Sequence, residues 1–459
     1  MRQIRGQKMK TAKAIDIKGL TGRIVTRNDE AYELGRMMWN RAIQKYPLVI
    51  CYCKNEEDIR NSILWARKHD MPIRIRSGRH HYDGYSIGND VLVIDVSEMN
   101  TMHIDEEAGH ITIAGGVRNR ELYEFLAERG YPFPGGTCPQ VGAVGYTLGG
   151  GWGYSGRLLG LGCDAVEEIR MMNAEGEVVI ANQSENKDLF WALKGSGGGQ
   201  FGVVTSIRFK LPPKRSEATL IRIEYHDADR DEQIKMFECY QNIIQTACNE
   251  INFKLGMYNS KDKGKGMLLL GAYYGHAQEA HQIITPFIQL GHEMNVSVNT
   301  MSVIEMNRWL QDAHPEYENY KSSGRFVNKA LTIEEMHTIL DTIEERPNGS
   351  IYAAISCYGM GGQMRKGSHQ DASFYYRDSL YILGIQTVWE DNQYSKENRE
   401  WFKERFPQIE ERTAGSFVNF PAGEVRGYKK AYYGAHAQRL EQIRKEYDPQ
   451  GVFNFEQGL

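Results

Sequence analysis

The first part of the chain alternates short apolar runs with amphipathic stretches. Residues 47–53 are apolar almost throughout and predict a buried strand, and residues 72–76 alternate as a second strand does. Between these runs, Asn55 can cap a helix that extends to about Lys68. Asp58 would occupy its first turn, where a carboxylate is favourable. This succession predicts an α/β or α+β fold.

The same rhythm continues along the chain. Residues 91–95 and 110–114 predict further strands, and residues 122–126 belong to a helix. The segment 210–216 contains two prolines and three basic residues and is the expected main boundary. Beyond it, two stretches have helical periodicity and two alternate like strands, which predicts a second α+β unit. The helices are expected at 232–247 and 333–346, and the strands at 267–274 and 351–358.

Composition and charge narrow the possible functions. The 459 residues carry 55 Lys and Arg against 59 Asp and Glu, a net charge of −4, which argues against nucleic-acid binding through a broad basic surface. No apolar run is long enough to predict a transmembrane helix. The basic start of the chain is not followed by an apolar segment, so we expect no signal peptide and a cytoplasmic location.

The seven cysteines are sparse and odd in number, so a disulfide scaffold is not expected. Cys51 and Cys53 lie in the first apolar run and are interpreted as buried structural thiols. The chain lacks the H-E-x-x-H, zinc-finger and Walker A patterns, so no metal or P-loop site is expected.

Glycine is concentrated in one region. Of 47 glycines, 17 lie between Gly135 and Gly202. Two stretches match the dinucleotide-binding spacing G-x-G-x-x-G, namely Gly151, Gly153 and Gly156, and Gly197, Gly199 and Gly202. The second is followed by a β-rich run instead of a helix, and the first follows a segment too rich in glycine for a core strand. A nicotinamide-binding Rossmann domain is therefore not expected, and the glycines instead suggest close approach of backbone to a ligand.

The polar loop at residues 76–84 (RSGRHHYDG) follows a predicted strand. Arginine, a hydroxyl group and free N–H groups beside a glycine suit a pyrophosphate. The alternative is a solvated surface loop whose histidines have no role.

Together these segments resemble flavin-dependent oxidases of the berberine-bridge-enzyme and glucooligosaccharide-oxidase type, within the vanillyl-alcohol-oxidase fold family. Five blocks match in order across nearly the whole chain. They are RSGRH (76–80), GTCPQVGAVGYTLGGGWG (136–153), DLFWALKGSGGGQFGVVT (188–205), YGMGG (358–362) with ASFYYR (372–377), and YYGAHAQRL (432–440) with YDP (447–449) and Phe453.

The resemblance implies an α+β fold with a two-part PCMH-type FAD-binding domain, residues 1–212 completed by 415–459. Residues 213–414 would form a substrate-binding domain whose antiparallel sheet covers the flavin. The loop 76–81 would hold the FAD diphosphate together with the backbone of the 136–153 block.

The resemblance also implies that FAD is attached twice, through His80 to the 8α carbon and through Cys138 to flavin C6. The other expected cofactor contacts are Arg76, Ser77, Gly78, Arg79, His81, Gly136, Thr137, Val141, Gly142, Gly145, Tyr146, Gly149, Gly153, Gly202, Val203 and His436. Arg79 departs from the family pattern, which has glycine there, and we expect its φ to be negative, with the side chain on phosphate or in solvent. Tyr146 stands where many relatives have histidine or leucine, and His436 where they usually have asparagine.

Oxidation of an alcohol needs a base for the O–H proton while hydride leaves carbon. The resemblance implies that Tyr432 is the first candidate, that the adjacent Tyr433 could exchange roles with it, and that Tyr358 could share the proton or orient the substrate. A tyrosine has a pKa near 10, so this role requires a nearby cation or donors. Arg365, Lys429 and Lys430 are the expected sources of positive charge.

Val141 aligns with a position that in the family is small in oxidases and bulkier where flavin reacts slowly with oxygen. The resulting hypothesis is a bicovalent FAD oxidase that oxidises a C–OH group of a sugar or bulky metabolite and reduces O2 to H2O2. A dehydrogenase of the same fold, or a flavin-binding structural or coat protein without turnover, are the alternatives. The expected partners are a small-molecule substrate and O2, without nucleic acid or membrane.

Overall fold

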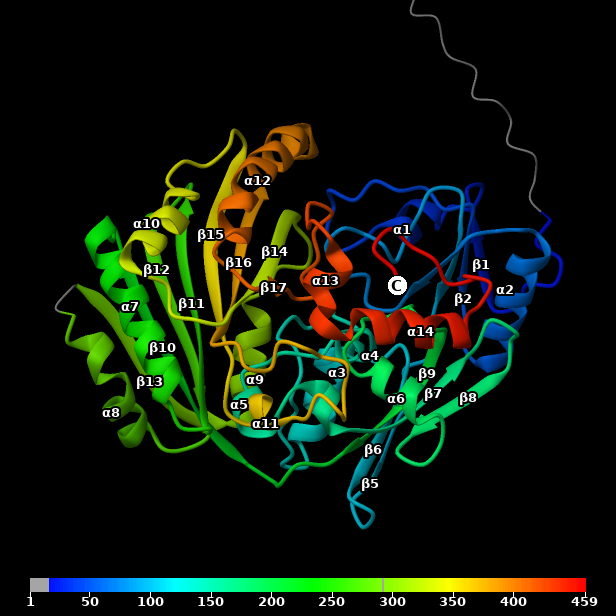
Figure 1. The fold of residues 1–459 in the computed structure, drawn as a ribbon, viewed down its shortest axis with the longest axis horizontal. Coiled ribbons are helices and arrows are strands. Elements are labelled where there is room, and N and C mark those ends of the chain that lie inside the picture. The colour runs from blue at the N-terminus through cyan, green and yellow to red at the C-terminus, as the bar shows by residue number, and fades with distance from the viewer. Residues whose placement is uncertain (1–15, 291–292) are drawn as a thin grey trace, which may run out of the picture.

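The described part of the chain folds around three β-sheets, as shown in Figure 1. A computed structural model describes residues 16–290 and 293–459. A four-stranded sheet and a five-stranded sheet come from the N-terminal part of the chain, and an eight-stranded sheet comes mainly from the middle. The expected α+β fold is confirmed.

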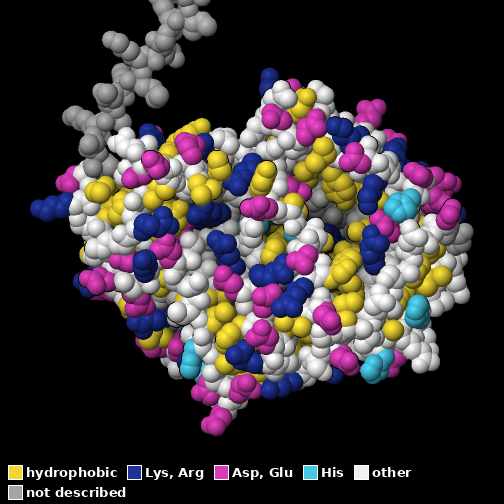
Figure 2. Space-filling view, turned by 180° about the vertical axis from the view of Figure 1, so that it is seen from behind, with side chains coloured by type: hydrophobic (Ala, Val, Ile, Leu, Met, Phe, Trp, Pro, Cys, Tyr) yellow, Lys and Arg dark blue, Asp and Glu magenta, His cyan; other side chains and the backbone are white. Residues whose placement is uncertain are grey.

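The surface has no dominant sign of charge on the face shown in Figure 2, where acidic and basic side chains are interspersed. This distribution agrees with the small net charge of −4. Within residues 16–290 and 293–459, no helix has the length and apolar character needed to cross a membrane.

The four-stranded sheet has the order β1-β2-β4-β3, in which β2, β4 and β3 are parallel and β1 is antiparallel to β2. Its strands are β1 (Arg23–Thr26), β2 (Val49–Tyr52), β3 (Ile73–Arg76) and β4 (Leu92–Asp95). Helix α2 (Glu56–Lys68) joins β2 to β3, and the Asn55 side chain accepts a hydrogen bond of 3.0 Å from the Asp58 N–H. The predicted strands and helix cap of this region are therefore confirmed.

The five-stranded sheet is antiparallel and has the order β5-β6-β9-β7-β8. Its strands are β5 (Met102–Asp105), β6 (His110–Ala114), β7 (Val166–Met172), β8 (Val178–Asn182) and β9 (Val203–Lys210). Because β9 begins directly after Gly202, the second G-x-G-x-x-G match leads into a strand, which confirms that it is not a Rossmann turn.

The eight-stranded sheet is antiparallel, in the order β13-β10-β12-β11-β15-β16-β14-β17. Its strands are β10 (Glu217–His226), β11 (Ile251–Ser260), β12 (Gly264–Tyr273), β13 (Met294–Ser302), β14 (Asn319–Val327), β15 (Ser350–Gly359), β16 (Tyr381–Trp389) and β17 (Gly415–Ser416). The predicted strands of this region are confirmed as β12 and β15.

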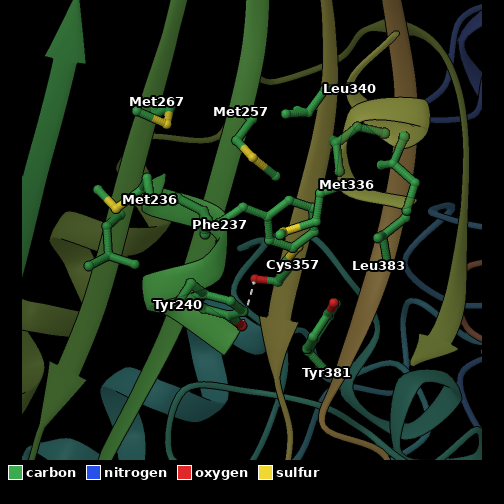
Figure 3. Close-up of a cluster of buried hydrophobic side chains, with 14 of the residues drawn as sticks. Met236, Phe237, Tyr240, Met257, Met267, Met336, Leu340, Cys357, Tyr381 and Leu383 are labelled. Atoms are coloured by element: carbon green, nitrogen blue, oxygen red, sulfur yellow. Dashed lines mark hydrogen bonds between the residues drawn. The ribbon is translucent and has the colours of Figure 1, made fainter. Parts of the chain in front are cut away.

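One face of this sheet is covered by α7 (Arg230–Thr246), α8 (Ala277–Ile288), α10 (Ile333–Asp341) and α12 (Ser395–Glu410). Figure 3 shows part of the core between them, where Phe237 and Tyr240 of α7 pack toward Met257 and Cys357 of the sheet. The Tyr240 hydroxyl donates a hydrogen bond of 3.2 Å to the Cys357 carbonyl. Helix α10 ends at Asp341, five residues earlier than predicted.

The remaining helices lie around the two smaller sheets and at the junction with the large one. They are α1 (Tyr32–Arg36), α3 (Asn119–Ala127), α4 (Ala143–Leu148), α5 (Gly156–Leu159), α6 (Lys187–Leu193), α9 (Val303–Asp312), α11 (Gln363–Lys366), α13 (Tyr428–Tyr433) and α14 (Ala437–Tyr447). Helices α13 and α14 share an apolar cluster with the five-stranded sheet, so the end of the chain returns to its N-terminal part.

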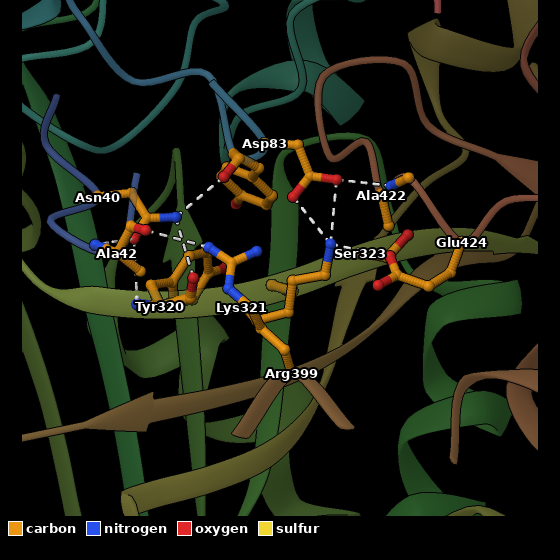
Figure 4. A network of polar contacts seen from close by, with 12 residues as sticks. Asn40, Ala42, Asp83, Tyr320, Lys321, Ser323, Arg399, Ala422 and Glu424 are labelled. Carbon is orange, nitrogen blue, oxygen red and sulfur yellow. Dashed lines mark hydrogen bonds and ion pairs between the residues drawn. The ribbon is translucent and has the colours of Figure 1, made fainter. Parts of the chain in front are cut away.

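Polar contacts also join the N-terminal part to the large sheet. The Asn40 side-chain amide donates to the carbonyls of Tyr82 and Tyr320, at 2.9 Å each, and Figure 4 shows this junction. These bonds tie the loop after β3 to β14, and so fix the position of the sheet over that loop.

Candidate functional site

A cavity of about 510 Å³ lies between the glycine-rich loops and the uncovered face of the large sheet. Strand alternation explains why this face lines it. Phe253 and Leu255 of β11 point into the apolar core, and Lys254 between them points into the cavity. On β15, Cys357 likewise points into the apolar core, and Tyr358 points into the cavity. The sheet therefore has one apolar face and one face able to bind a ligand.

The opposite wall is built by close contact between two of the predicted blocks. A Cβ atom added to Gly78 would collide with the Gly142 nitrogen and the Gln140 carbonyl oxygen. Glycine at residue 78 therefore lets the loop after β3 pack directly on the segment before α4. The Ser77 hydroxyl donates to the Gly115 carbonyl at 3.0 Å and helps to hold this loop in place.

Gly145 on α4 differs from these packed glycines. A Cβ atom at this position would meet no protein atom within 4 Å, and Gly145 lines the cavity together with Gly198 and Gly199. Nothing in the fold of the chain itself requires glycine at residue 145. The bare backbone there leaves room for a flat group against the helix.

Arg76 is buried at the end of β3, where its Nε donates to Asp95 Oδ2 at 2.7 Å. Its Nη1 is buried and has no hydrogen-bond partner among the described residues. The guanidinium is thus held in place by one carboxylate and keeps a donor for a ligand at the cavity, which Arg76 lines.

The backbone conformation of Arg79 differs from the expected one. Its φ is +63°, in the left-handed region, instead of negative. Its side chain turns back to the protein, where Nη2 donates to the Tyr52 hydroxyl at 3.0 Å and Nη1 to the Leu34 carbonyl at 3.3 Å. These contacts stabilise the positive φ of Arg79. The family pattern has glycine at this position, and glycine adopts a positive φ without strain.

His80 lines the cavity and stacks on Trp39, with ring centroids 5.0 Å apart. Burial, with smaller effects from the nearby His314 and Arg118, lowers the pKa of His80 to about 3. Its Nε2 is buried without a hydrogen-bond partner among the described residues. The ring is therefore neutral and keeps a free nitrogen lone pair. His81 also lines the cavity, against Tyr85, and burial lowers its pKa to about 4.

Cys138 lines the same cavity, and its Sγ lies 3.5 Å from Nδ1 of His314. Burial raises the pKa of the Cys138 thiol to about 11. The Asn119 side chain holds the turn by donating to the carbonyls of Gly136 and Cys138, at 3.1 Å each. All seven cysteines are in the described part of the chain, and Cys138 alone among them lines the cavity.

Comparison with known proteins shows to which family a chain with this cavity belongs. A model described as "FAD binding domain" matches residues 47–182, and one described as "Berberine and berberine like" matches residues 416–459. The uncharacterized FAD-linked oxidoreductase YgaK of Bacillus subtilis (strain 168) is 32% identical over 445 residues, which cover 96% of this chain and 97% of that protein. The chain belongs to the berberine-bridge-enzyme-like family of FAD-linked oxidoreductases.

Two solved structures share the fold. Physcomitrella patens BBE-like 1 has a TM-score of 0.85 and 24% identity, and the match covers 94% of this chain and 96% of that one. The carbohydrate oxidase from Microdochium nivale, solved with a substrate analogue, has a TM-score of 0.86 and 21% identity over 95% of this chain and 97% of that one.

The cavity fits FAD. The unpartnered Nη1 of Arg76 can serve a phosphate, and the bare backbone at Gly145 can lie against the flat ring system. His80 and Cys138 line the same cavity. Most of the other predicted cofactor contacts also do so: Ser77, Gly78, Arg79, His81, Gly136, Thr137, Val141, Gly142, Tyr146 and Gly202.

Five predicted site residues are not among those that line the cavity: Gly149, Gly153, Val203, Tyr433 and His436. Gly153 has a packing reason instead, since a Cβ atom there would collide with the Gly135 carbonyl oxygen. The Nδ1 of His436 lies 2.9 Å from the Ser373 carbonyl oxygen, and its ring packs edge-on against Trp191.

The three tyrosines proposed as bases have different surroundings. The Tyr432 hydroxyl donates to Gln457 Oε1 at 2.6 Å, and the Tyr433 hydroxyl donates to the Ser196 carbonyl at 2.9 Å. Burial raises the pKa of both. The Tyr358 hydroxyl has no hydrogen bond to another residue of the described part, and Lys254 Nζ lies 5.0 Å from the centre of its ring. Tyr358 is therefore the freest of the three to meet a substrate.

The cations expected beside the tyrosines lie elsewhere. Lys429 pairs with Glu441 at 2.5 Å, and Arg365 donates to the Asp378 carbonyl at 3.3 Å; neither lines the cavity, nor does Lys430. Lys254 supplies positive charge on the sheet side instead. Alternation of polar and apolar residues in the run 253–257 could have revealed it, because one polar residue between buried neighbours must face another environment.

Four other polar residues on the sheet side were not predicted: His314, Glu318, Tyr320 and Gln386. Burial raises the pKa of Glu318 to about 7, although the charge of Lys254 acts in the opposite direction. Burial, followed by the charge of Lys254, lowers the pKa of His314 to about 4. Single polar residues of this kind have no motif in the sequence. No cluster that could hold a metal ion occurs within residues 16–290 and 293–459.

Proposed function

We propose that this protein is an oxidase with FAD bound covalently to His80 and Cys138. It oxidises a C–OH group of a sugar or another bulky metabolite and passes the electrons to O2, giving H2O2. The supporting observation is that one cavity is lined both by the two proposed attachment residues and by ionisable side chains of the large sheet, such as Lys254 and Tyr358. Residues 1–212 with 415–459 would form the FAD-binding domain, and residues 213–414 the substrate-binding domain.

The two proposed attachment residues are suited to covalent chemistry with an electrophilic ring. His80 is a neutral imidazole with an unpartnered nitrogen, and Cys138 is a thiol with an imidazole 3.5 Å away. Bound FAD would supply the two-electron chemistry, while the protein handles protons and excludes competing reactions.

On the sheet side, Tyr358 is the favoured residue to receive or orient the alcohol proton, because its hydroxyl is free and Lys254 lies close to its ring. Tyr432 also lines the cavity and stays a candidate. It would have to lose the proton that it donates to Gln457 before it could accept one from the substrate. Tyr433 is the weakest of the three, since it lies outside the lining.

The carbohydrate oxidase from Microdochium nivale has the same fold, which supports a sugar as the first substrate class to test. The cavity lining includes Trp152, Trp309 and Tyr154, and aromatic faces of this kind suit the apolar side of a sugar ring. Val141 also lines the cavity, where a small side chain leaves space for oxygen.

A panel of mono- and oligosaccharides and aryl alcohols, read by peroxide formation, tests the donor. Anaerobic reduction followed by mixing with air tests the acceptor. Rapid return of the oxidised flavin spectrum is expected, and reduced flavin that persists for minutes would make the protein a dehydrogenase. Absence of flavin reduction by every alcohol would favour a flavin-binding protein without turnover.

Attachment has a separate test. The chain is denatured in acid, washed and weighed. His80→Ala and Cys138→Ala should each keep one linkage, and the double variant should release all FAD. If the wild-type chain releases FAD completely, the attachment proposal is wrong.

A further inference from the structure

The side of the cavity at Cys138 contains a pair that none of the sequence motifs predicts. Cys138 comes from the loop between α3 and α4, and His314 comes from the loop between α9 and β14. Their Sγ and Nδ1 atoms lie 3.5 Å apart, which is within hydrogen-bonding distance for sulfur. The thiol and the imidazole are thus supplied by two segments far apart in the sequence.

We propose that His314 is the proton acceptor that activates Cys138 for formation of its bond to flavin C6. This inference rests on the proposed function, because it assumes that Cys138 is an attachment site. It adds that the attachment site is assembled only when the loop after α9 lies against the loop before α4.

Helix α3 holds both partners in place. At its start, the Asn119 side chain holds the Cys138 carbonyl at 3.1 Å, and the Arg120 N–H donates to the Pro139 carbonyl at 3.0 Å. The Arg120 side chain pairs with Asp312, two residues before His314. A single helix therefore sets the position of the thiol and of the imidazole.

The His314 loop has a second support on its other side. The Trp39 indole Nε1 donates to the Pro315 carbonyl at 3.1 Å, and the same ring stacks on His80. The two histidines are consequently fixed relative to each other across Trp39. Such a fixed arrangement fits a site that must bring a thiol and an imidazole together in one geometry.

The resting pair is neutral. Burial lowers the pKa of His314 to about 4 and raises that of Cys138 to about 11. In the tautomer that has its proton on Nε2, the His314 imidazole accepts a hydrogen bond from the thiol at Nδ1. The other ionisable groups that act on the two side chains are Lys254 on β11, Glu318 just before β14, and His80, Tyr82 and Tyr146 on the loop side. A neutral thiol reacts poorly, because the thiolate is the nucleophile. Proton transfer to His314 as the bond forms removes this obstacle.

The chemistry balances with one oxidant. The S–H and C6–H bonds break and one S–C6 bond forms. The thiol proton passes to His314 Nδ1, the C6 hydrogen leaves as a second proton, and the two electrons released go to O2. Thiol, oxidised FAD and O2 thus give thioether-linked oxidised FAD and H2O2, after His314 returns its proton to solvent.

The experiment follows attachment through Cys138 alone, in a His80→Ala background. Apo protein is mixed with FAD in air, and samples are denatured, washed and weighed over time. We expect His314→Gln to slow the mass gain by about 10²-fold, the usual effect of removing a proton acceptor. Its rate should rise about tenfold per pH unit as thiolate forms, whereas the parent with His314 should depend less on pH. His281→Gln, at an exposed site on α8, is the matched control and should attach FAD as the parent does.

Three outcomes would overturn the inference, and they are distinguishable. If the parent gains no mass, Cys138 is not an attachment site and that part of the proposed function also fails. If the parent and His314→Gln gain mass at the same rate, attachment stands but His314 has no part in it. If His314→Gln no longer binds FAD before denaturation, His314 has a structural role. Chemical rescue is the second measurement: imidazole added to His314→Ala should restore the rate, and absence of rescue counts against proton transfer.

Discussion

Lys321 of β14 lies between two carboxylates from opposite ends of the chain. Its Nζ is 2.8 Å from Asp83 Oδ1 and 2.8 Å from Glu424 Oε2. Figure 4 shows these three side chains at the junction. The Lys321 side chain is only 3% exposed, so little solvent screens the two pairs. This cation joins the loop after β3, the large sheet and the C-terminal segment at one point.

Lys321→Met should destabilise the protein by about 3–5 kcal/mol, because it leaves Asp83 and Glu424 without their buried partner. Urea unfolding followed by tryptophan fluorescence measures the change. Lys214→Met is the matched control, since the pair of Lys214 with Glu106 is exposed and should contribute little to stability. If both variants lose the same free energy of unfolding, burial does not increase the contribution of the Lys321 ion pairs to stability.

Gly145→Ala should separate folding from cofactor binding. The new methyl group meets no protein atom within 4 Å, and alanine in a helix is favoured over glycine by about 1 kcal/mol, so the apo protein should become slightly more stable. The same methyl group fills space that we assign to FAD. We expect affinity to fall by about tenfold, as overpacking by one methyl costs about 1–3 kcal/mol. Equilibrium FAD binding in a His80→Ala, Cys138→Ala background measures this effect.

Gly78→Ala is the contrasting variant. Its methyl group would collide with backbone atoms of Gly142 and Gln140, which cannot move away as a side chain can. The apo protein should therefore lose stability. If Gly145→Ala binds FAD as tightly as the parent, the helix backbone does not contact the cofactor.

Local patterns predicted most of the fold, since each element has a strong local signal. Asn55 marks the start of α2, and alternation marks β12 and β15. The length of α10 was overestimated, because the helical spacing of apolar residues continues to Ile343 although the helix ends at Asp341. The strand order in the large sheet could not be predicted from the sequence. Strand β15 pairs with β11 across about a hundred residues, and no local pattern encodes such pairing.

The loop side of the site was largely predicted, whereas on the sheet side Tyr358 was predicted and the other ionisable residues were not. His80 and Cys138 stand in long motifs of glycine and polar residues, where the backbone itself limits the sequence. His314 and Glu318 are single polar residues whose meaning arises only when the sheet lies over the loops. Arg79 is a residue of the loop side whose backbone conformation was predicted wrongly. A non-glycine residue in a glycine position suggested negative φ, but its hydrogen bonds to Tyr52 and Leu34 hold it at +63°.

Arg79 gives a direct test of that explanation. Arg79→Ala and Arg79→Gly both remove the side-chain hydrogen bonds, but alanine keeps the strain of positive φ, and glycine does not. We expect the glycine variant to be more stable than the alanine variant by about 1 kcal/mol. Thermal unfolding of the two variants side by side measures the difference. An alanine variant as stable as the glycine variant would mean that the loop relaxes to negative φ once the arginine is gone.

Glu318 should make the protein less stable as pH rises. Burial raises its pKa to about 7 in the folded chain, against 4.5 for an ordinary glutamate. Below pH 4.5 the group is protonated in both states and has no effect. Between pH 4.5 and 7 the unfolded chain loses the proton first, so unfolding becomes progressively more favourable, and above pH 7 the full penalty applies. Integrated over this range, the penalty is about 3 kcal/mol at most.

Glu318→Gln removes this titration and should flatten the dependence of stability on pH. In urea unfolding, the free energy of unfolding of the variant relative to that of the wild type should be higher at pH 8 than at pH 5. Glu316→Gln, at an exposed position on the same loop, controls for the loss of one negative charge. If both variants follow the wild type at both pH values, Glu318 is hydrated in the native protein. It would then not be available as a neutral acid near pH 7 to donate a proton to a bound substrate.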